Sequence, residues 1–97
     1  IIASAKAAIE GLTVTLAAEL APTIRVNCIA PSLTDSKISQ SMLKSEVVAE
    51  ALAKMHPLKR LGKGNDSAAL AKFLLSDESP WITGQIIGVD GNATRLD

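Results

Sequence analysis

The sequence has almost no cysteine or histidine and carries no net charge. Its 97 residues include one cysteine, one histidine, and ten acidic residues that balance ten basic ones. Because a lone cysteine excludes an internal disulfide, we expect Cys28 to be a small buried apolar residue in a reducing compartment, the alternative being a reactive thiol. One histidine and one cysteine argue against a metal site. A balanced charge supplies no field that would favour nucleic acid or an anionic membrane surface.

Long apolar runs are missing as well. No uninterrupted apolar stretch approaches the roughly 20 residues that span a bilayer, and no signal-peptide pattern opens the chain. We therefore expect a cytoplasmic protein with neither a nucleic acid nor a membrane as partner. The residues from Ile1 to Ala3 already belong to an apolar helical pattern, and no capping residue precedes them. This start predicts that residues 1–97 are a fragment of a longer domain.

A short β-branched run at residues 24–30 ends at Pro31, where hydroxyl and carboxylate side chains begin. The run has almost no polar face, which predicts a buried parallel strand covered on both sides by helices. In open α/β sheets the ligand crevice lies beyond the carboxyl ends of the strands. Residues 31–36 are therefore predicted to face a ligand.

Residues 3–20 carry the longest helical pattern. Apolar residues at spacings of three and four form one stripe, which consists of Ala5, Ala8, Ile9, Leu12, Leu16 and Leu20. The opposite side is uncharged too, with Ala3, Ala7, Gly11, Val14 and Ala18. A helix of this kind is normally buried on two sides. We predict that the Leu12 and Leu16 side packs on the sheet and that the side of small residues meets other helices at a subunit interface.

The rest of the chain predicts more helices and one more strand. A turn or two of helix is expected near residues 38–43, and Ser45 is the expected N-cap of a helix that ends before Pro57. A further helix over 66–76, starting at Asn65 or Asp66, leads to a strand over 85–90. Strand, helices and strand in this order predict a right-handed crossover between parallel strands, hence an α/β fold. Two strands cannot cover these helices, so the remainder of the sheet is expected outside residues 1–97.

Several polar residues have two interpretations from their type alone. His56 is expected to be an ordinary loop histidine. Lys59, Arg60 and Lys63 could receive a phosphate, but three cations around a glycine are more often a solvated turn. Lys6 is expected to be solvated, as most lysines are.

Six segments, in this order and spacing, resemble one family. They are Ala5–Leu12, Leu16–Pro22, Ile24–Pro31, Pro57–Gly62, Thr83–Gln85 and Val89–Gly91. Together they resemble the C-terminal part of a short-chain dehydrogenase/reductase. The resemblance implies that residues 1–97 are the C-terminal part of a single Rossmann-type domain with a doubly wound parallel sheet. It also implies that the glycine-rich dinucleotide turn, the first five strands and the catalytic serine precede Ile1.

The resemblance assigns a catalytic and cofactor-binding role to Lys6. This residue matches the lysine of the family's Tyr-x-x-x-Lys motif, which binds the nicotinamide ribose hydroxyls and lowers the pKa of the tyrosine. The tyrosine position of the motif falls on Ile2, which has no proton to give. The usual proton relay to a substrate carbonyl therefore lacks its central member.

The resemblance also places cofactor contacts in the loop after the first strand. Pro31 matches the family's Pro-Gly turn, in which Ser32 replaces the glycine, and Leu33 follows. Thr34 falls where the family's backbone contacts the nicotinamide carboxamide, and Ser36 falls where a threonine hydroxyl does so. Serine keeps a donor and an acceptor of the same kind. The closing segment Asp90–Asn92 lacks the family's second glycine.

Two classes of function stay open. The first is an NAD- or NADP-dependent oxidoreductase that transfers hydride between nicotinamide and an alcohol or carbonyl substrate, with another acid in place of the tyrosine. The second is a non-catalytic relative that binds dinucleotide or a partner. Residues 1–97 alone are expected to be inactive, and residues 35–55 would form a substrate lid. The family resemblance also implies a homodimer or homotetramer built on the helix over 3–20.

Overall fold

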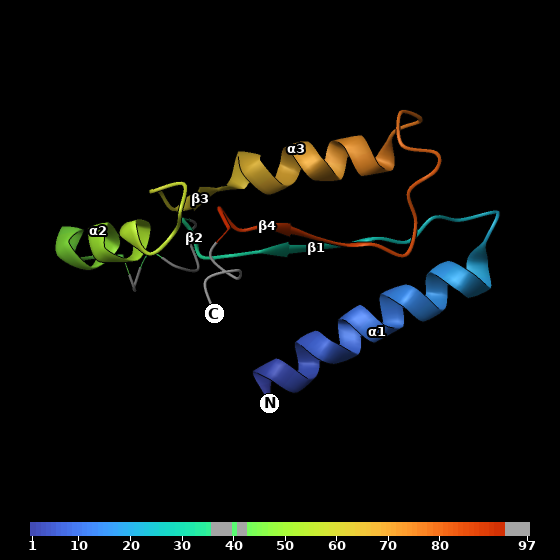
Figure 1. Cartoon of the computed structure of the whole chain (residues 1–97), viewed down its shortest axis with the longest axis horizontal. Helices are drawn as coiled ribbons and strands as arrows, with labels where there is room; N and C mark the ends of the chain where they lie inside the picture. Colours follow the sequence, from blue (N-terminus) through green and yellow to red (C-terminus); the bar gives the residue numbers. More distant parts are fainter. Residues whose placement is uncertain (36–39, 41–42, 93–97) are drawn as a thin grey trace. The chain divides into compact units, whose positions relative to one another are not determined.

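The computed structural model describes residues 1–35, 40 and 43–92. Within them the elements are α1 (Ile2–Leu20), β1 (Cys28–Pro31), β2 (Thr34–Asp35), α2 (Glu46–Lys54), β3 (Gly62–Lys63), α3 (Gly64–Leu75) and β4 (Ile86–Val89) (Figure 1). The chain divides into a first unit, Ile1–Ile29 with Leu70–Ile87, and a second unit, Ala30–Ala69 with Gly88–Asp97. Among the described residues, no helix is both long enough and apolar enough to cross a membrane.

β1 and β4 are neighbours in one sheet, and their hydrogen bonds show that they run parallel. The Cys28 amide donates to the Gln85 carbonyl (2.8 Å), and the Ser32 amide donates to the Val89 carbonyl (3.3 Å). The donor moves from Cys28 to Ser32 while the acceptor moves from Gln85 to Val89, so both residue numbers increase together. This is the pattern of parallel strands. The predicted parallel pairing and the α/β class are confirmed.

The prediction that the first strand begins at residue 24 is wrong, because side chains take part of the ladder there, beside one backbone bond from the Gly84 amide to the Val26 carbonyl (2.7 Å). The Val26 amide donates to Thr83 Oγ1, and the Gln85 amide donates to Asn27 Oδ1, each at 3.1 Å. Regular pairing starts only at Cys28. The expected burial on both faces is also not found. In this two-stranded sheet both strands are edges, and residues 28–30 are only half-buried.

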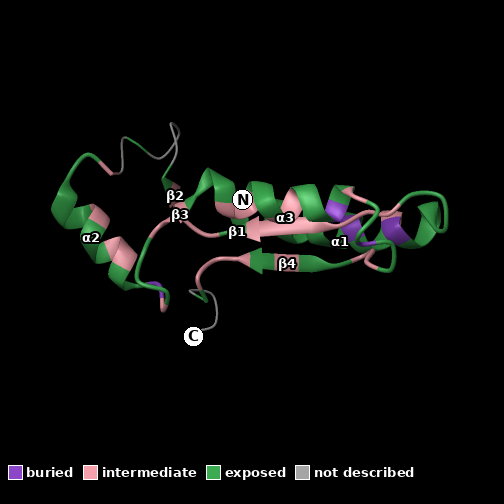
Figure 2. Ribbon diagram, turned by 90° about the horizontal axis from the view of Figure 1, so that it is seen from above, coloured by how far each residue is buried: buried purple, intermediate pink, exposed green. Residues whose placement is uncertain are grey.

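α1 confirms the predicted long helix but buries a different side. Thr13 and Ala17 are buried, Leu16 is half-buried, and Leu12 is 56% exposed. Most of α1 is exposed (Figure 2), and the residues described do not show Leu12 packed on the sheet. The physical reason is that α1 approaches the backbone at Gly84 closely. Ala17 Cβ lies only 3.4 Å from the position that a Cβ on Gly84 would take, so a small residue rather than a leucine meets the turn before β4.

Gly84 adopts a left-handed backbone conformation with φ of +71°, in the first unit. Gly84→Ala is expected to lower the free energy of unfolding by about 1–2 kcal/mol, because a Cβ is disfavoured at this φ. Urea denaturation measures the change. Gly64→Ala is the matched control, since no atom within 4 Å would meet its Cβ and the position lies in α3. A control loss as large as that of Gly84→Ala would contradict the conformational explanation.

Arg25 and Asn27 tie distant segments of the first unit together. Arg25 Nη2 donates to the carbonyls of Leu74 (2.7 Å) and Ser76 (3.2 Å), and Nη1 donates to that of Ile82 (3.2 Å). Asn27 Nδ2 donates to the same Ile82 carbonyl at 3.1 Å. The bonds to Leu74 and Ser76 satisfy carbonyls at the C-terminal end of α3, and the bonds to Ile82 hold the segment before β4.

The second unit contains α2 and a short parallel ladder. Ser45 caps α2 as predicted, with its Oγ accepting from the Val48 amide at 3.5 Å. β2 pairs with β3 in the register Thr34 to Gly62 and Asp35 to Lys63. Neither of these strands was expected, since two residues carry no periodic signal. Most of the turn expected at residues 38–43 lies outside the described residues.

α3 begins one to two residues earlier than the sequence indicates, at Gly64. The expected N-cap Asp66 instead lies in the first turn, where its carboxylate reaches back and accepts from the Lys63 amide at 2.7 Å. An acidic side chain at this position satisfies a free amide at the helix start and interacts favourably with the helix dipole. The Asp66 side chain therefore caps the N-terminus of α3 from a position in the first turn.

Candidate functional site

Lys6 lies on α1 in the first unit, with its side chain exposed. It makes no hydrogen bond or ion pair with any residue in the described part of the chain. Ile2 precedes it by one helical turn, on the same side of the helix, and is 75% exposed. The ammonium is thus free to bind a ligand, next to an aliphatic side chain that cannot donate a proton.

The loop after β1 belongs to the second unit and is held mainly by Ser32. The Ser32 amide donates to the Val89 carbonyl, and the Ser32 carbonyl accepts from Thr34 Oγ1 at 3.0 Å. Its hydroxyl lies 3.0 Å from His56 Nε2. All three polar groups of Ser32 are therefore engaged within the loop and its neighbours.

Pro31, Leu33 and Thr34 complete the described part of this loop. Pro31 is exposed, whereas Leu33 and Thr34 are half-buried. The Leu33 carbonyl accepts from the Gly62 amide at 3.1 Å, and a Cβ on Gly62 would lie 3.0 Å from Thr34 Oγ1. The absence of a side chain on Gly62 thus lets β3 approach the loop. Ser36, the remaining predicted contact, lies outside the described residues.

His56 is the residue that the sequence interpretation missed. It lies in a loop as expected, but it is 5% exposed and makes specific contacts that the sequence did not indicate. Its Nδ1 lies 2.9 Å from the Leu52 carbonyl, four residues earlier in α2. A histidine one residue past the C-cap of a helix can reach a carbonyl of the last turn in this way, and that position was the available signal.

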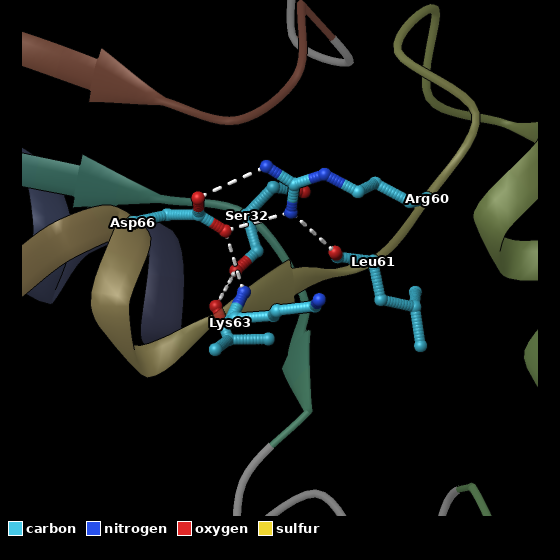
Figure 3. A network of polar contacts seen from close by, with 6 residues as sticks. Ser32, Arg60, Leu61, Lys63 and Asp66 are labelled. Carbon is cyan, nitrogen blue, oxygen red and sulfur yellow. Dashed lines mark hydrogen bonds and ion pairs between the residues drawn. The ribbon is translucent and has the colours of Figure 1, made fainter.

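A cavity of about 480 Å³ lies within the second unit. The residues that matter for its chemistry are Ser32, His56, Leu58, Arg60, Asp66 and Gly91. Arg60 and Asp66 form a two-bond ion pair on its wall, with Nη1 to Oδ2 at 2.7 Å and Nη2 to Oδ1 at 2.9 Å (Figure 3). Arg60 is thus occupied by a carboxylate, and Lys59 Nζ donates to the Lys54 carbonyl at 3.2 Å. These contacts favour the interpretation of this segment as a structural turn over that of a phosphate site.

The Arg60 pair changes the acidity of Asp66. The hydrogen bond from Arg60, followed by that from the Lys63 amide, lowers the pKa of Asp66 to about 2. The same carboxylate raises the pKa of Arg60. A carboxyl group whose pKa is lower in the folded chain stabilises the fold above its ordinary pKa of about 4, and this contribution disappears as the pH falls towards 2.

We expect Asp66→Asn to be less stable than the wild type at pH 7 and to lose less stability between pH 4 and pH 2. Chemical denaturation at several pH values measures both quantities. Asp77→Asn is the control, because Asp77 is exposed and takes part in no ion pair with a described residue. Equal pH profiles for the wild type and Asp66→Asn would contradict this role of the carboxylate.

The predicted residues thus fall into two segments, each described within its own unit. The first is Lys6 with Ile2 on α1, and the second is the loop from Pro31 to Thr34. An exposed ammonium without a partner among the described residues can donate to the hydroxyl groups of a ribose. Among the residues that the structure describes, no cluster of three or more histidine, cysteine, aspartate or glutamate residues could hold a metal ion.

Comparisons with known proteins identify the family of this chain. The family model described as "Enoyl-(Acyl carrier protein) reductase" matches residues 1–94. The short-chain dehydrogenase/reductase SDRA of Arabidopsis thaliana is 43% identical over 86 residues, which cover 89% of this chain and 34% of that protein. The chain spans about a third of the length of the curated relatives it matches.

Solved structures show the same similarity. A short-chain dehydrogenase family protein from Francisella tularensis matches with a TM-score of 0.85 and 34% identity, over 94% of this chain and 42% of that one. The 4-hydroxyisoleucine dehydrogenase complexed with NADH matches with a TM-score of 0.90 and 26% identity, over 97% of this chain and 39% of that one. The chain belongs to the short-chain dehydrogenase/reductase family.

Proposed function

We propose that residues 1–97 are the C-terminal part of a longer, nicotinamide-dependent oxidoreductase domain. The chain spans about a third of its curated relatives, which is consistent with a larger domain whose earlier strands and dinucleotide turn lie before Ile1. The complete protein would transfer hydride between NAD or NADP and a small alcohol or carbonyl compound. The observation that carries this proposal is the exposed, unpaired ammonium of Lys6 at the family's lysine position.

The chain's own residues would bind and orient the cofactor. Lys6 would hold the nicotinamide ribose hydroxyls through its ammonium. The loop from Pro31 to Thr34, continued by Ser36, would hold the carboxamide, and its internal hydrogen bonds support a fixed loop shape. The nicotinamide, when bound, supplies the hydride. A similar protein, 4-hydroxyisoleucine dehydrogenase, forms a complex with NADH, which supports nicotinamide as the cofactor.

A second candidate is a non-catalytic relative that binds dinucleotide without efficient turnover. Ile2 favours it, because the motif position that would hold the acid is aliphatic, and the 97 residues contain no tyrosine at all. An oxidoreductase would then need another acid, either from a segment before Ile1 or from a bound water.

Binding and turnover measurements on the complete protein separate these candidates. NADH and NADPH are titrated by fluorescence, and a panel of simple ketones and aldehydes is then assayed with the cofactor that binds. Binding with turnover supports the oxidoreductase, and binding without turnover supports the non-catalytic relative. Failure to bind either cofactor would rule out both. We expect residues 1–97 alone to show no turnover.

Assembly and location are part of the same proposal. The exposed side of α1 that carries Ala7, Gly11, Val14 and Ala18 supports a homodimer or homotetramer built on this helix. Sedimentation of the complete protein measures the oligomeric state, and a monomer would contradict it. The free thiol of Cys28 supports a reducing compartment, for which we propose the cytoplasm.

A further inference from the structure

The buried ring of His56 has only one arrangement of protons that satisfies both of its contacts in the neutral form. The Leu52 carbonyl can only accept, so Nδ1 must donate to it across 2.9 Å. Nε2 then carries the lone pair and accepts from the Ser32 hydroxyl across 3.0 Å. The last turn of α2 thus fixes the tautomer that holds Ser32.

The backbone around His56 is held as firmly as its ring. Its amide donates to the Ala53 carbonyl at 3.1 Å, and its carbonyl accepts from the Lys59 amide at 2.7 Å. A Cβ on Gly91, which has a φ of +58°, would lie 3.5 Å from His56 Cβ, so the turn after β4 closes against the histidine. The ring is therefore a fixed point rather than a mobile side chain.

A serine that donates to an oriented histidine is also the arrangement of a nucleophile and its base. The bonding of Ser32 favours a different role. Its amide donates to Val89 and its carbonyl accepts from Thr34 Oγ1, so that its hydroxyl is the third of three bonds that hold one loop residue. Together these bonds join β4, the loop and the end of α2 within the second unit.

We propose that His56 is a positioning residue that fixes the cofactor loop from Pro31 to Thr34 through the Ser32 hydroxyl. The pair stabilises one loop conformation at a position where the family's Pro-Gly turn has a glycine. A glycine there would have more backbone freedom and no side chain to anchor. This inference rests on the proposed function only for its effect on cofactor binding, and the order of the loop itself can be measured without a cofactor.

The test is a double-mutant cycle in the complete protein, with Ser32→Ala, His56→Phe and both changes together. Amide hydrogen exchange of the cofactor-free protein is measured for peptides that cover residues 31–34. Each single variant is expected to accelerate exchange by about 5-fold, the effect of one net hydrogen bond. The double variant should be no faster than His56→Phe, because both changes remove the same bond. Ser32→Thr should restore the slow exchange, since it keeps the hydroxyl.

Ser67→Ala is the matched control, since it removes a serine hydroxyl on α3 in the same unit that forms no hydrogen bond with a described residue. It should leave exchange at residues 31–34 unchanged. If the complete protein binds NADH or NADPH, Ser32→Ala should weaken binding by a similar factor. Independent, additive effects of the two substitutions, or unchanged exchange in Ser32→Ala, would overturn the proposal. Slow exchange that depends on the pair, without cofactor binding, would support the positioning role and contradict only the proposed function.

Discussion

Replacing Lys6 by alanine in the complete protein is expected to weaken binding of NADH or NADPH by roughly 10- to 100-fold. Hydrogen bonds that involve a charged donor contribute about 1.5–3 kcal/mol each, and every 1.4 kcal/mol corresponds to a factor of ten in affinity. The Lys6 side chain is exposed and has no partner among the residues described, so its removal should not disturb the fold. Fluorescence titration of the cofactor measures the change.

Lys72→Ala provides the matched control for this experiment. Lys72 is also an exposed lysine on a helix without an ion pair to a described residue, but it lies on α3, far along the chain from the motif. It removes the same charge and should leave the dissociation constant unchanged. Lys6→Arg keeps the charge with a different shape and should recover only part of the affinity. Undiminished affinity in Lys6→Ala would disprove the assignment of Lys6.

Ile2→Tyr is expected to raise carbonyl reduction by roughly 10²-fold or more, the usual contribution of a positioned general acid. The structure places residue 2 one helical turn before Lys6, so the new phenol and the ammonium would share one side of α1. The neighbouring positive charge would lower the pKa of the phenol and favour proton exchange with a substrate. The measured quantity is kcat for a panel of ketones and aldehydes.

Ile2→Phe separates the hydroxyl from the ring in this experiment. It introduces the same aromatic volume without a proton, so it should leave kcat at the level of the unmodified protein. A gain that Ile2→Phe reproduces would show that packing, not acid catalysis, is responsible. Efficient reduction by the unmodified protein, with no further gain from tyrosine, would show that another acid already compensates for Ile2.

Local patterns in the sequence predicted the helices well. α1 was expected at residues 3–20 and occupies Ile2–Leu20, and Ser45 caps α2 as its position before an acidic first turn indicates. Helix periodicity and capping depend on neighbours within about four residues, so one sequence suffices to read them. The side of α1 that is buried was not predictable in this way. Ala17 is buried because it packs against the turn at Gly84, which is distant in the sequence.

Features that depend on contacts far apart in the sequence were missed. β1 starts at Cys28 because the side chains of Thr83 and Asn27 take part of the ladder before it. β2 and β3 exist only through their mutual pairing. His56 was correctly assigned to a loop, but its contact with Ser32 was missed because nothing near it in sequence shows that Ser32 lies within hydrogen-bond distance. For the site, Lys6 and the loop came from the resemblance to a family rather than from residue type, which alone indicated a solvated lysine.

The bonds of Arg25 and Asn27 also have a consequence for the growing chain during synthesis. Arg25 and Asn27 bind carbonyls that lie 49 to 57 residues later in the sequence. At a translation rate of about 5–20 residues per second, the Ile82 carbonyl is added about 3–11 s after Arg25. During this interval the apolar side chains of α1 and of the segment before β1 have no access to their partners in residues 70–87. We therefore expect a ribosome-bound chain truncated before Leu70 to recruit chaperones that recognise exposed apolar segments, and a chain extended past Val89 to release them.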